Sequence, residues 1–314
     1  MPKIAIMTDS NCGITPDDAQ KYHIHILPMP VLVGEDTFYE GCNITSEEFY
    51  RKLSSGEPVT TSQPSPADVM KMWDQLLKEH DEVVHVPMSS GLSNSCQTAL
   101  LLAQEEYFKG RVHVVDNHRI SVTQAQSVLD AVELTRQRFT GAQIKEILET
   151  EAMDATIYIA VDTLEYLKKG GRITAAAAAI GTVLNLKPVL TIQGDKLDAY
   201  TKTRGMKSAF KAMCKALDKD LSGRLSALHT QGLLKAGILH TVISHHSSET
   251  IGNLRLQILE KRIFTIGTDS HHQLIISNIF QQQIEIFGSS LKVSIHIPYI
   301  YRLCIVDTCF HSST

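Results

Sequence analysis

The sequence contains no uninterrupted apolar stretch of the roughly 18 residues or more that a membrane-spanning helix needs. The alanine-rich run Ala175–Ile180 is apolar but far too short. The N-terminal residues also lack the basic segment, the long apolar stretch and the small-residue cleavage site of a secretory signal. We therefore expect a protein without a membrane span that resides in the cytoplasm.

Positive charge is not in excess either. The formal net charge is -4 and the sequence pI is about 6.4, so there is no electrostatic reason to expect a nucleic-acid partner. Apolar residues make up 43% of the 314 residues, which is enough material for the cores of two domains.

Several motifs of reactive or metal-binding proteins are missing. The chain has no His-Glu-x-x-His, no Walker loop and no Gly-x-Ser-x-Gly elbow. Its six cysteines are scattered without a Cys-x-x-Cys pair, which predicts reduced thiols. The adjacent pairs His245-His246 and His271-His272 would diverge on a helix or strand, so a shared metal is not expected. We predict no metal and no cofactor.

Strand-like and helix-like segments alternate along the chain, which predicts an α/β fold with mostly parallel sheets. The pattern of the sequence changes near residues 150–160, which predicts two domains, 1–155 and 156–314. Asp9 and Asp116 follow two predicted strands, and structural hydrogen bonding is a better interpretation of both than acid–base chemistry. The main predicted strands are Lys3–Met7, Ile24–Val33, Glu82–Pro87, Arg111–Asp116, Thr156–Val161, Lys187–Ile192, Lys196–Thr203 and Leu239–Ser244; the main predicted helices are Ala67–His80, Cys96–Glu106, Ile120–Thr135, Ala142–Met153, Met206–Leu221 and Ser248–Lys261.

Two hydroxyl-rich turns are the strongest local signals, Thr60–Ser65 and Ser89–Ser95, and each precedes a predicted helix. Prolines and hydroxyl residues predict irregular backbone throughout Val59–Pro66. The N-terminus of a helix carries partial positive charge and unpaired N–H groups, which suit a carboxylate or a phosphate. Plain helix capping is the alternative interpretation of either turn.

A third candidate is Gly170-Gly171-Arg172, which follows Lys168 and Lys169. Two glycines let the backbone approach another group closely, and the three cations favour an anion. The alternative here is a solvated loop with a glycine that caps a helix.

These features occur in an order that resembles the DegV family of fatty-acid-binding proteins. The resemblance covers residues 1–215 well and 239–296 more weakly. The matching motifs are Thr8-Asp9-Ser10, Thr60-Thr61-Ser62-Gln63-Pro64-Ser65, Ser89-Ser90-Gly91-Leu92-Ser93, Val115-Asp116 and Leu164…Leu167-Lys168-Lys169-Gly170-Gly171-Arg172-Ile173.

The resemblance implies two α/β domains with a lipid tunnel between them. It implies a carrier that holds a long-chain fatty acid, such as palmitate, stearate or oleate. It also implies that the protein presents the carboxylate to a fatty acid kinase subunit for acyl-phosphate formation, and is not itself an enzyme. Burial of the tail is worth about 0.8 kcal/mol per CH₂, so the head group needs only a few donors to fix its orientation.

The same resemblance implies roles for particular residues. Thr61 and Ser93 correspond to the hydroxyls that bind the carboxylate, and Ser62 and Asn94 to neighbours that offer backbone N–H groups. His296 corresponds to a late histidine that contacts the head group or the acyl phosphate. Arg172 and Arg204 correspond to arginines at the kinase-docking surface or the rim of the head-group site.

The chain departs from the family pattern at three places, one of which is the segment Ser222–His240. The family has Ser-Gly-Thr where this chain has Ser93-Asn94-Ser95, and asparagine tolerates left-handed backbone better than most residues. Residues 292–314 are atypical for the family.

Two alternatives to a carrier stay open. One is an enzyme that acts on acyl phosphates or esters at the same site, which would need a base against Ser93 or Thr61. The other is an altered copy of a family member with a non-functional tail.

Overall fold

The computed structural model describes residues 2–161, 163–179, 186–192, 196–231, 234–241, 264–268, 274–276 and 290–296. The chain divides into two units, Met1–Ala152 and Met153–Thr314. The boundary expected between residues 155 and 156 falls just after this division. No helix in the described ranges has both the length and the apolar character to cross a bilayer.

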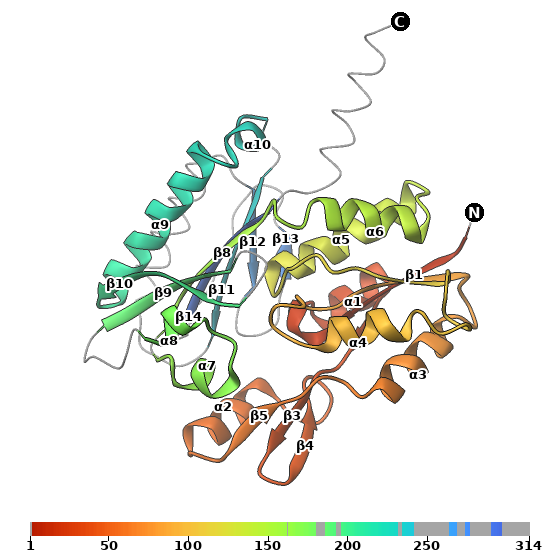
Figure 1. The fold of residues 1–314 in the computed structure, drawn as a ribbon, viewed down its shortest axis with the longest axis horizontal. Coiled ribbons are helices and arrows are strands. Elements are labelled where there is room, and N and C mark those ends of the chain that lie inside the picture. The colour runs from red at the N-terminus through yellow and green to blue at the C-terminus, as the bar shows by residue number, and fades with distance from the viewer. Residues whose placement is uncertain are drawn as a thin grey trace, which may run out of the picture. The chain divides into compact units, whose positions relative to one another are not determined.

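A four-stranded parallel sheet forms the centre of the first unit, in the order β2-β1-β6-β7 (β1 is labelled in Figure 1). Its strands are β1 (Ile4–Asp9), β2 (Ile24–Leu27), β6 (Glu82–Val86) and β7 (Val112–Val114). Because β1, β6 and β7 are adjacent and parallel, the residues that follow these three strands emerge at one edge of the sheet.

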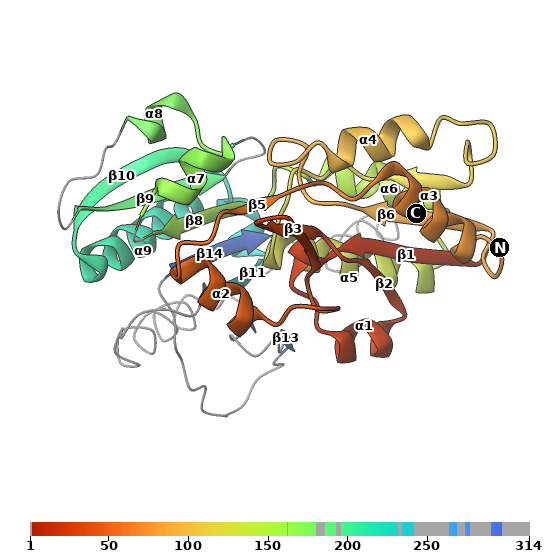
Figure 2. The same cartoon turned by 90° about the horizontal axis from the view of Figure 1, so that it is seen from below.

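Helices cover both faces of this sheet (Figure 2). On one face, α3 and α4 pack on Ala5, Met7 and Val83 around the fully buried Trp73. On the other face, α5 and α6 contact β1, β6 and β7. The helices of this unit are η1 (Ser10–Cys12), α1 (Pro16–Tyr22), α2 (Ser46–Ser54), α3 (Pro66–Leu76), α4 (Ser95–Leu102), α5 (Val122–Arg136) and α6 (Gly141–Thr150).

A second, antiparallel sheet of the first unit corrects two predictions. It has the order β4-β3-β5, with β3 (Pro30–Val33), β4 (Asp36–Tyr39) and β5 (Val59–Thr61). The single strand predicted over Ile24–Val33 is wrong, because β2 and β3 belong to different sheets. Pro28, which has no N–H for a sheet ladder, lies between them.

The irregular backbone predicted over Val59–Pro66 is wrong for its first three residues. Val59, Thr60 and Thr61 are β-branched and pair with β3, and the strand ends before Pro64.

The second unit holds a seven-stranded sheet, in the order β10-β9-β8-β14-β11-β12-β13. Parallel pairing is complete in the central sheet of the first unit, whereas here the ladders are antiparallel apart from β11–β12. Strands that follow each other closely along the chain, such as β9 and β10, pair as antiparallel neighbours. The predicted α/β class is confirmed. The strands are β8 (Thr156–Ala160), β9 (Leu186–Ile192), β10 (Asp198–Arg204), β11 (Lys235–Thr241), β12 (Phe264–Thr268), β13 (Leu274–Ile276) and β14 (Ser290–His296).

The long helix α9 packs along one face of this sheet. Its apolar side contacts Tyr158, Ala160 and Val189 from β8 and β9. The helices of this unit are α7 (Glu165–Gly170), α8 (Ala175–Ala178), α9 (Met206–Ser222) and α10 (Ser226–Thr230). The helix predicted over Ser248–Lys261 and the two histidine pairs lie outside the described residues.

Candidate functional site

The turn between β6 and α4 places the Ser93 hydroxyl at the start of a helix. The N–H groups of Leu92 and Ser93 both donate to the Ser89 carbonyl, at 3.0 and 3.1 Å, which closes the turn. The Ser93 Oγ accepts a hydrogen bond of 3.2 Å from the Ser95 N–H. Because that bond uses only an acceptor position of the Ser93 hydroxyl, the hydroxyl proton is available to donate to another group. A carboxylate accepts hydrogen bonds only, so this donor has the right polarity for one.

Asn94 is the N-cap residue of α4 and has φ -74° and ψ -4°. This is right-handed backbone, so the turn does not use the left-handed conformation that asparagine tolerates. The Asn94 side chain makes no capping hydrogen bond. The first N–H groups of a helix have no intrahelical partner, so backbone N–H groups in the first turn of α4 can donate to a ligand. Next to them, the buried Ser95 Oγ has no hydrogen-bond partner.

The turn between β5 and α3 places Thr61 and Ser62 at a strand end. Thr61 is the exposed last residue of β5 and pairs with Val31. The Ser62 N–H donates to the Pro30 carbonyl at 3.3 Å, and its hydroxyl donates to the Gln63 carbonyl at 3.2 Å. Ser62 could therefore offer its N–H to a ligand only by giving up the long bond to Pro30.

One side-chain hydrogen bond joins the two turns. Thr98 Oγ1 donates to Gln63 Oε1 at 3.2 Å, and the Thr98 N–H donates to the Asn94 carbonyl at 2.9 Å. Gln63 belongs to the first turn, and Thr98 lies one helical turn beyond Asn94. The structure thus joins Gln63 of the first turn to the helix that follows the second turn, within the first unit.

Asp9 supports the same edge of the sheet from β1. Its carboxylate accepts the Met88 N–H at 2.7 Å and the Gln124 side-chain amide at 3.2 Å. Burial raises the pKa of Asp9, against the lowering effect of these hydrogen bonds. The hydrogen-bonding role favoured by the sequence fits this geometry.

The Gly-Gly-Arg segment of the second unit follows α7. Gly171 caps α7 with φ 68°, which is left-handed backbone, so the capping interpretation holds for this glycine. The Leu197 N–H donates to the Arg172 carbonyl at 3.0 Å, which fixes this segment beside the start of β10. The Arg172 guanidinium also folds back to the Gly170 carbonyl.

The sheet register separates Arg204 from the other two candidates of the second unit. Arg204 ends β10 opposite Leu186, whereas Arg172 lies at the other end of that strand. His296 ends β14 opposite Lys235, one residue after Ile295, which pairs with Thr156 at the start of β8. At about 3.3 Å per residue, Arg204 and His296 lie roughly 25 Å apart along the strand direction. The structure does not bring their backbones together.

A surface hollow of about 440 Å³ lies elsewhere on the first unit. It is lined by residues such as Pro28, Tyr39, Cys42 and Met72, and only Pro64 comes from a hydroxyl-rich turn. None of the predicted site residues lines it. Within the described residues, no group of three or more histidine, cysteine or acidic side chains could hold a metal ion.

Comparison with known proteins places these features in a family. A family model described as "Uncharacterised protein, DegV family" matches residues 3–257. A DegV domain-containing protein of Deinococcus radiodurans is 36% identical over 207 residues, which is 66% of this chain and 73% of that protein.

Solved structures give the same result for the fold. The structure described as "Fatty Acid Binding of a DegV family Protein from Thermus thermophilus" matches with a TM-score of 0.77 and 28% identity, over 94% of this chain and 99% of that one. A stearic-acid-binding protein of Eubacterium ventriosum has a TM-score of 0.77 at 20% identity, over 95% and 99% of the two chains. At that identity the second likeness shows the fold alone.

Proposed function

This chain belongs to the DegV family, and on that premise we propose that it binds a long-chain fatty acid such as palmitate, stearate or oleate and presents the carboxylate to a fatty acid kinase subunit. In this proposal the protein is a carrier, and the acyl phosphate forms in the active site of the kinase partner.

One observation carries the proposal. The Ser93 hydroxyl stands at the N-terminus of α4 with its acceptor side occupied by Ser95, so its proton can donate to an anion. The Gln63–Thr98 hydrogen bond joins the turn that follows the exposed Thr61 to that helix. Two hydroxyl donors and a helix N-terminus supply the donors that a carboxylate requires, since a charged group without partners is costly to bury.

The enzyme alternative lacks this kind of support. It needs a base that takes the proton of Ser93 or Thr61. The two carboxylates at the neighbouring strand ends, Asp9 and Asp116, instead accept the backbone N–H groups of Met88 and Ser90. A carrier asks for no such base.

We propose the cytoplasm as the place of this exchange. Cys12, Cys42, Cys96 and Cys214 are free thiols, and Cys42 is exposed. Free thiols persist in a reducing compartment.

Ligand identification on the purified protein tests the proposal. Native mass spectrometry should show one bound fatty acid, or uptake of one added oleate by delipidated protein. Thr61→Ala and Ser93→Ala should each weaken oleate binding about tenfold, the loss of roughly one charge-assisted hydrogen bond.

Two matched substitutions serve as controls. Thr37→Ala removes another exposed threonine of the same three-stranded sheet. Thr140→Ala removes a true N-cap, since the Thr140 hydroxyl accepts the Gln143 N–H at the start of α6. Both should leave oleate binding unchanged. A wild-type protein that takes up no fatty acid would refute the proposal.

A further inference from the structure

Hydrogen bonds from three consecutive backbone N–H groups fix the segment that follows β6. Met88 donates to Asp9 Oδ2 at 2.7 Å, Ser89 donates to the Arg119 carbonyl at 2.8 Å, and Ser90 donates to Asp116 Oδ1 at 3.3 Å. Asp9 ends β1 and Asp116 follows β7, the two strands that flank β6 in the sheet. The turn is therefore held from both sides.

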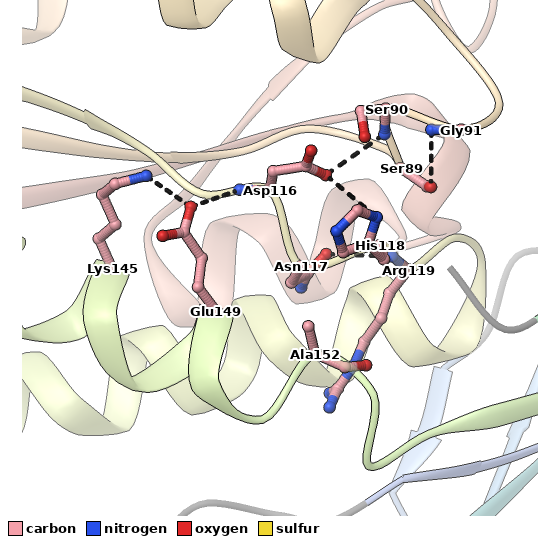
Figure 3. Close-up of polar contacts among 10 residues, drawn as sticks. All are labelled: Ser89, Ser90, Gly91, Asp116, Asn117, His118, Arg119, Lys145, Glu149 and Ala152. Carbon is pink, nitrogen blue, oxygen red and sulfur yellow. Dashed lines mark hydrogen bonds and ion pairs between the residues drawn. The ribbon is translucent and has the colours of Figure 1, made fainter. Parts of the chain in front are cut away.

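The Asp116 side of this attachment is itself fixed in place (Figure 3). The Asp116 N–H donates to Glu149 Oε1 at 3.0 Å, and Lys145 contacts the same oxygen and donates to the Val114 carbonyl. His118 Nδ1 lies 3.9 Å from Asp116 Oδ1 on the other side. Helix α6 thus supports Asp116 from below, and Figure 3 shows Asp116 between that helix and the turn.

Asp116 also reaches the first turn of α4. Its negative charge lies near the Cys96 thiol, and burial together with this neighbouring charge raises the pKa of Cys96. One side chain therefore influences residues on both sides of Ser93 in sequence, Ser90 through a hydrogen bond and Cys96 through its charge.

The loop that carries Asp116 has an unusual backbone. His118 has φ 54° and Ser121 has φ 59°, both in the left-handed region that non-glycine residues rarely adopt. Buried Arg119 stabilises this loop by donating to the Ala152 and Glu151 carbonyls and to the Ser127 hydroxyl. Strained backbone held by its surroundings clusters at functional sites.

We infer that Asp116 is the positioning residue of the head-group site: it fixes the Ser89–Asn94 turn so that the Ser93 hydroxyl meets the fatty-acid carboxylate. This rests on the proposed function. Asp116 acts through Ser90 and does not touch the ligand. The Ser90 attachment matters for Ser93 because the adjacent Ser89 carbonyl accepts the N–H groups that close the turn.

Binding of two ligands by delipidated protein tests this inference. Oleate carries the carboxylate, and methyl oleate keeps the tail without the charge. Asp116→Ala should weaken oleate binding about tenfold and leave methyl oleate binding unchanged, because only the head group depends on Ser93. Asp116→Asn should restore most of the oleate affinity, since the amide oxygen still accepts the Ser90 N–H.

The control is Asp81→Ala, which removes a carboxylate that also accepts one backbone N–H, from Lys3 at 2.7 Å, away from the turn. It should change neither ligand. In a Ser93→Ala background, Asp116→Ala should have no further effect on oleate.

Several results would overturn the inference while the proposed function survives. An equal loss of oleate and methyl oleate means that Asp116 is merely structural. A failure of Asp116→Asn to restore binding means that its charge, not its hydrogen bond, is needed. If wild-type protein binds neither ligand, the proposed function itself fails.

Discussion

Thr98 Oγ1 donates a 3.2 Å hydrogen bond to Gln63 Oε1, across 35 residues of sequence. This bond joins the Thr60–Ser65 segment to α4, and we expect it to set the spacing between Thr61 and Ser93, which precedes that helix. Both side chains are partly buried, where a hydrogen bond is worth about 0.5–1.5 kcal/mol.

Thr98→Val and Gln63→Ala should therefore weaken oleate binding by a few-fold each. The double variant should lose little more than either single one, because both remove the same bond. Isothermal titration of the four proteins measures the coupling. Thr37→Val, on the exposed strand β4, is the control. Additive losses would mean that the bond does not act as a unit in ligand binding.

His85 predicts a specific pH dependence of stability. It is buried in β6 with its ring 5.8 Å from Trp73, edge to face, and burial lowers the pKa of His85 to about 3. In the unfolded chain the pKa returns to its ordinary value of 6.5. Between these values the unfolded state binds a proton that the folded state does not, so stability falls as pH drops below 6.5. From pH 7 to pH 5 this group should remove about 2 kcal/mol.

Urea unfolding at the two pH values checks this, with the fluorescence of Trp73 as the probe. Trp73 is the chain's single tryptophan, so the signal reports the first unit. His85→Leu should reduce the pH slope without abolishing it, because burial also lowers the pKa values of His25 and His113. An unchanged slope in His85→Leu contradicts the assignment.

These features differ in how far the sequence reveals them. Local patterns predict β1, β6 and β7, because apolar β-branched runs and turn residues are short-range signals. The same signals merge β2 with β3 over Ile24–Val33, because they do not show that the two strands join different sheets. The Gln63–Thr98 bond and the Ser90–Asp116 bond join residues that are distant in sequence, so no spacing rule predicts them. Asn94 was expected to rely on its tolerance of left-handed backbone, but the structure needs only ordinary helical angles there. The burial of His85 beside Trp73 likewise depends on which face of β6 meets α3.

In the second unit, too, the sequence predicts local pairing but not long-range pairing. The pair β9–β10 is readable because its strands are close in sequence. The place of β14 between β8 and β11 comes from long-range pairing, and it is this pairing that separates Arg204 from His296.

Arg204 tests the proposed kinase partner. It is exposed at the end of β10, so a charge reversal there should not disturb the fold. Arg204→Glu should lower acyl-phosphate formation with the kinase about tenfold, because reversed rim charges oppose complementary surfaces. Oleate affinity should stay within about twofold if Arg204 serves docking alone. Lys215→Glu, an exposed charge reversal on α9, is the control. A loss of oleate affinity in Arg204→Glu would instead place this arginine at the head group.

Asn94→Asp should move stability and binding in opposite directions. Asn94 caps α4 without using its side chain, so an aspartate there meets the positive end of the helix and should stabilise the first unit by about 0.3–1 kcal/mol. The same negative charge would face the fatty-acid carboxylate beside Ser93 and should weaken oleate binding about tenfold.

Methyl oleate, which has no charge to repel, should bind as before. Asn43→Asp adds the same charge to the first unit outside both hydroxyl-rich turns and should leave oleate binding unchanged. If Asn94 serves only as a helix cap, Asn94→Asp should raise stability and leave oleate binding unchanged. A more stable protein that also binds oleate more weakly would therefore place the carboxylate at the start of α4.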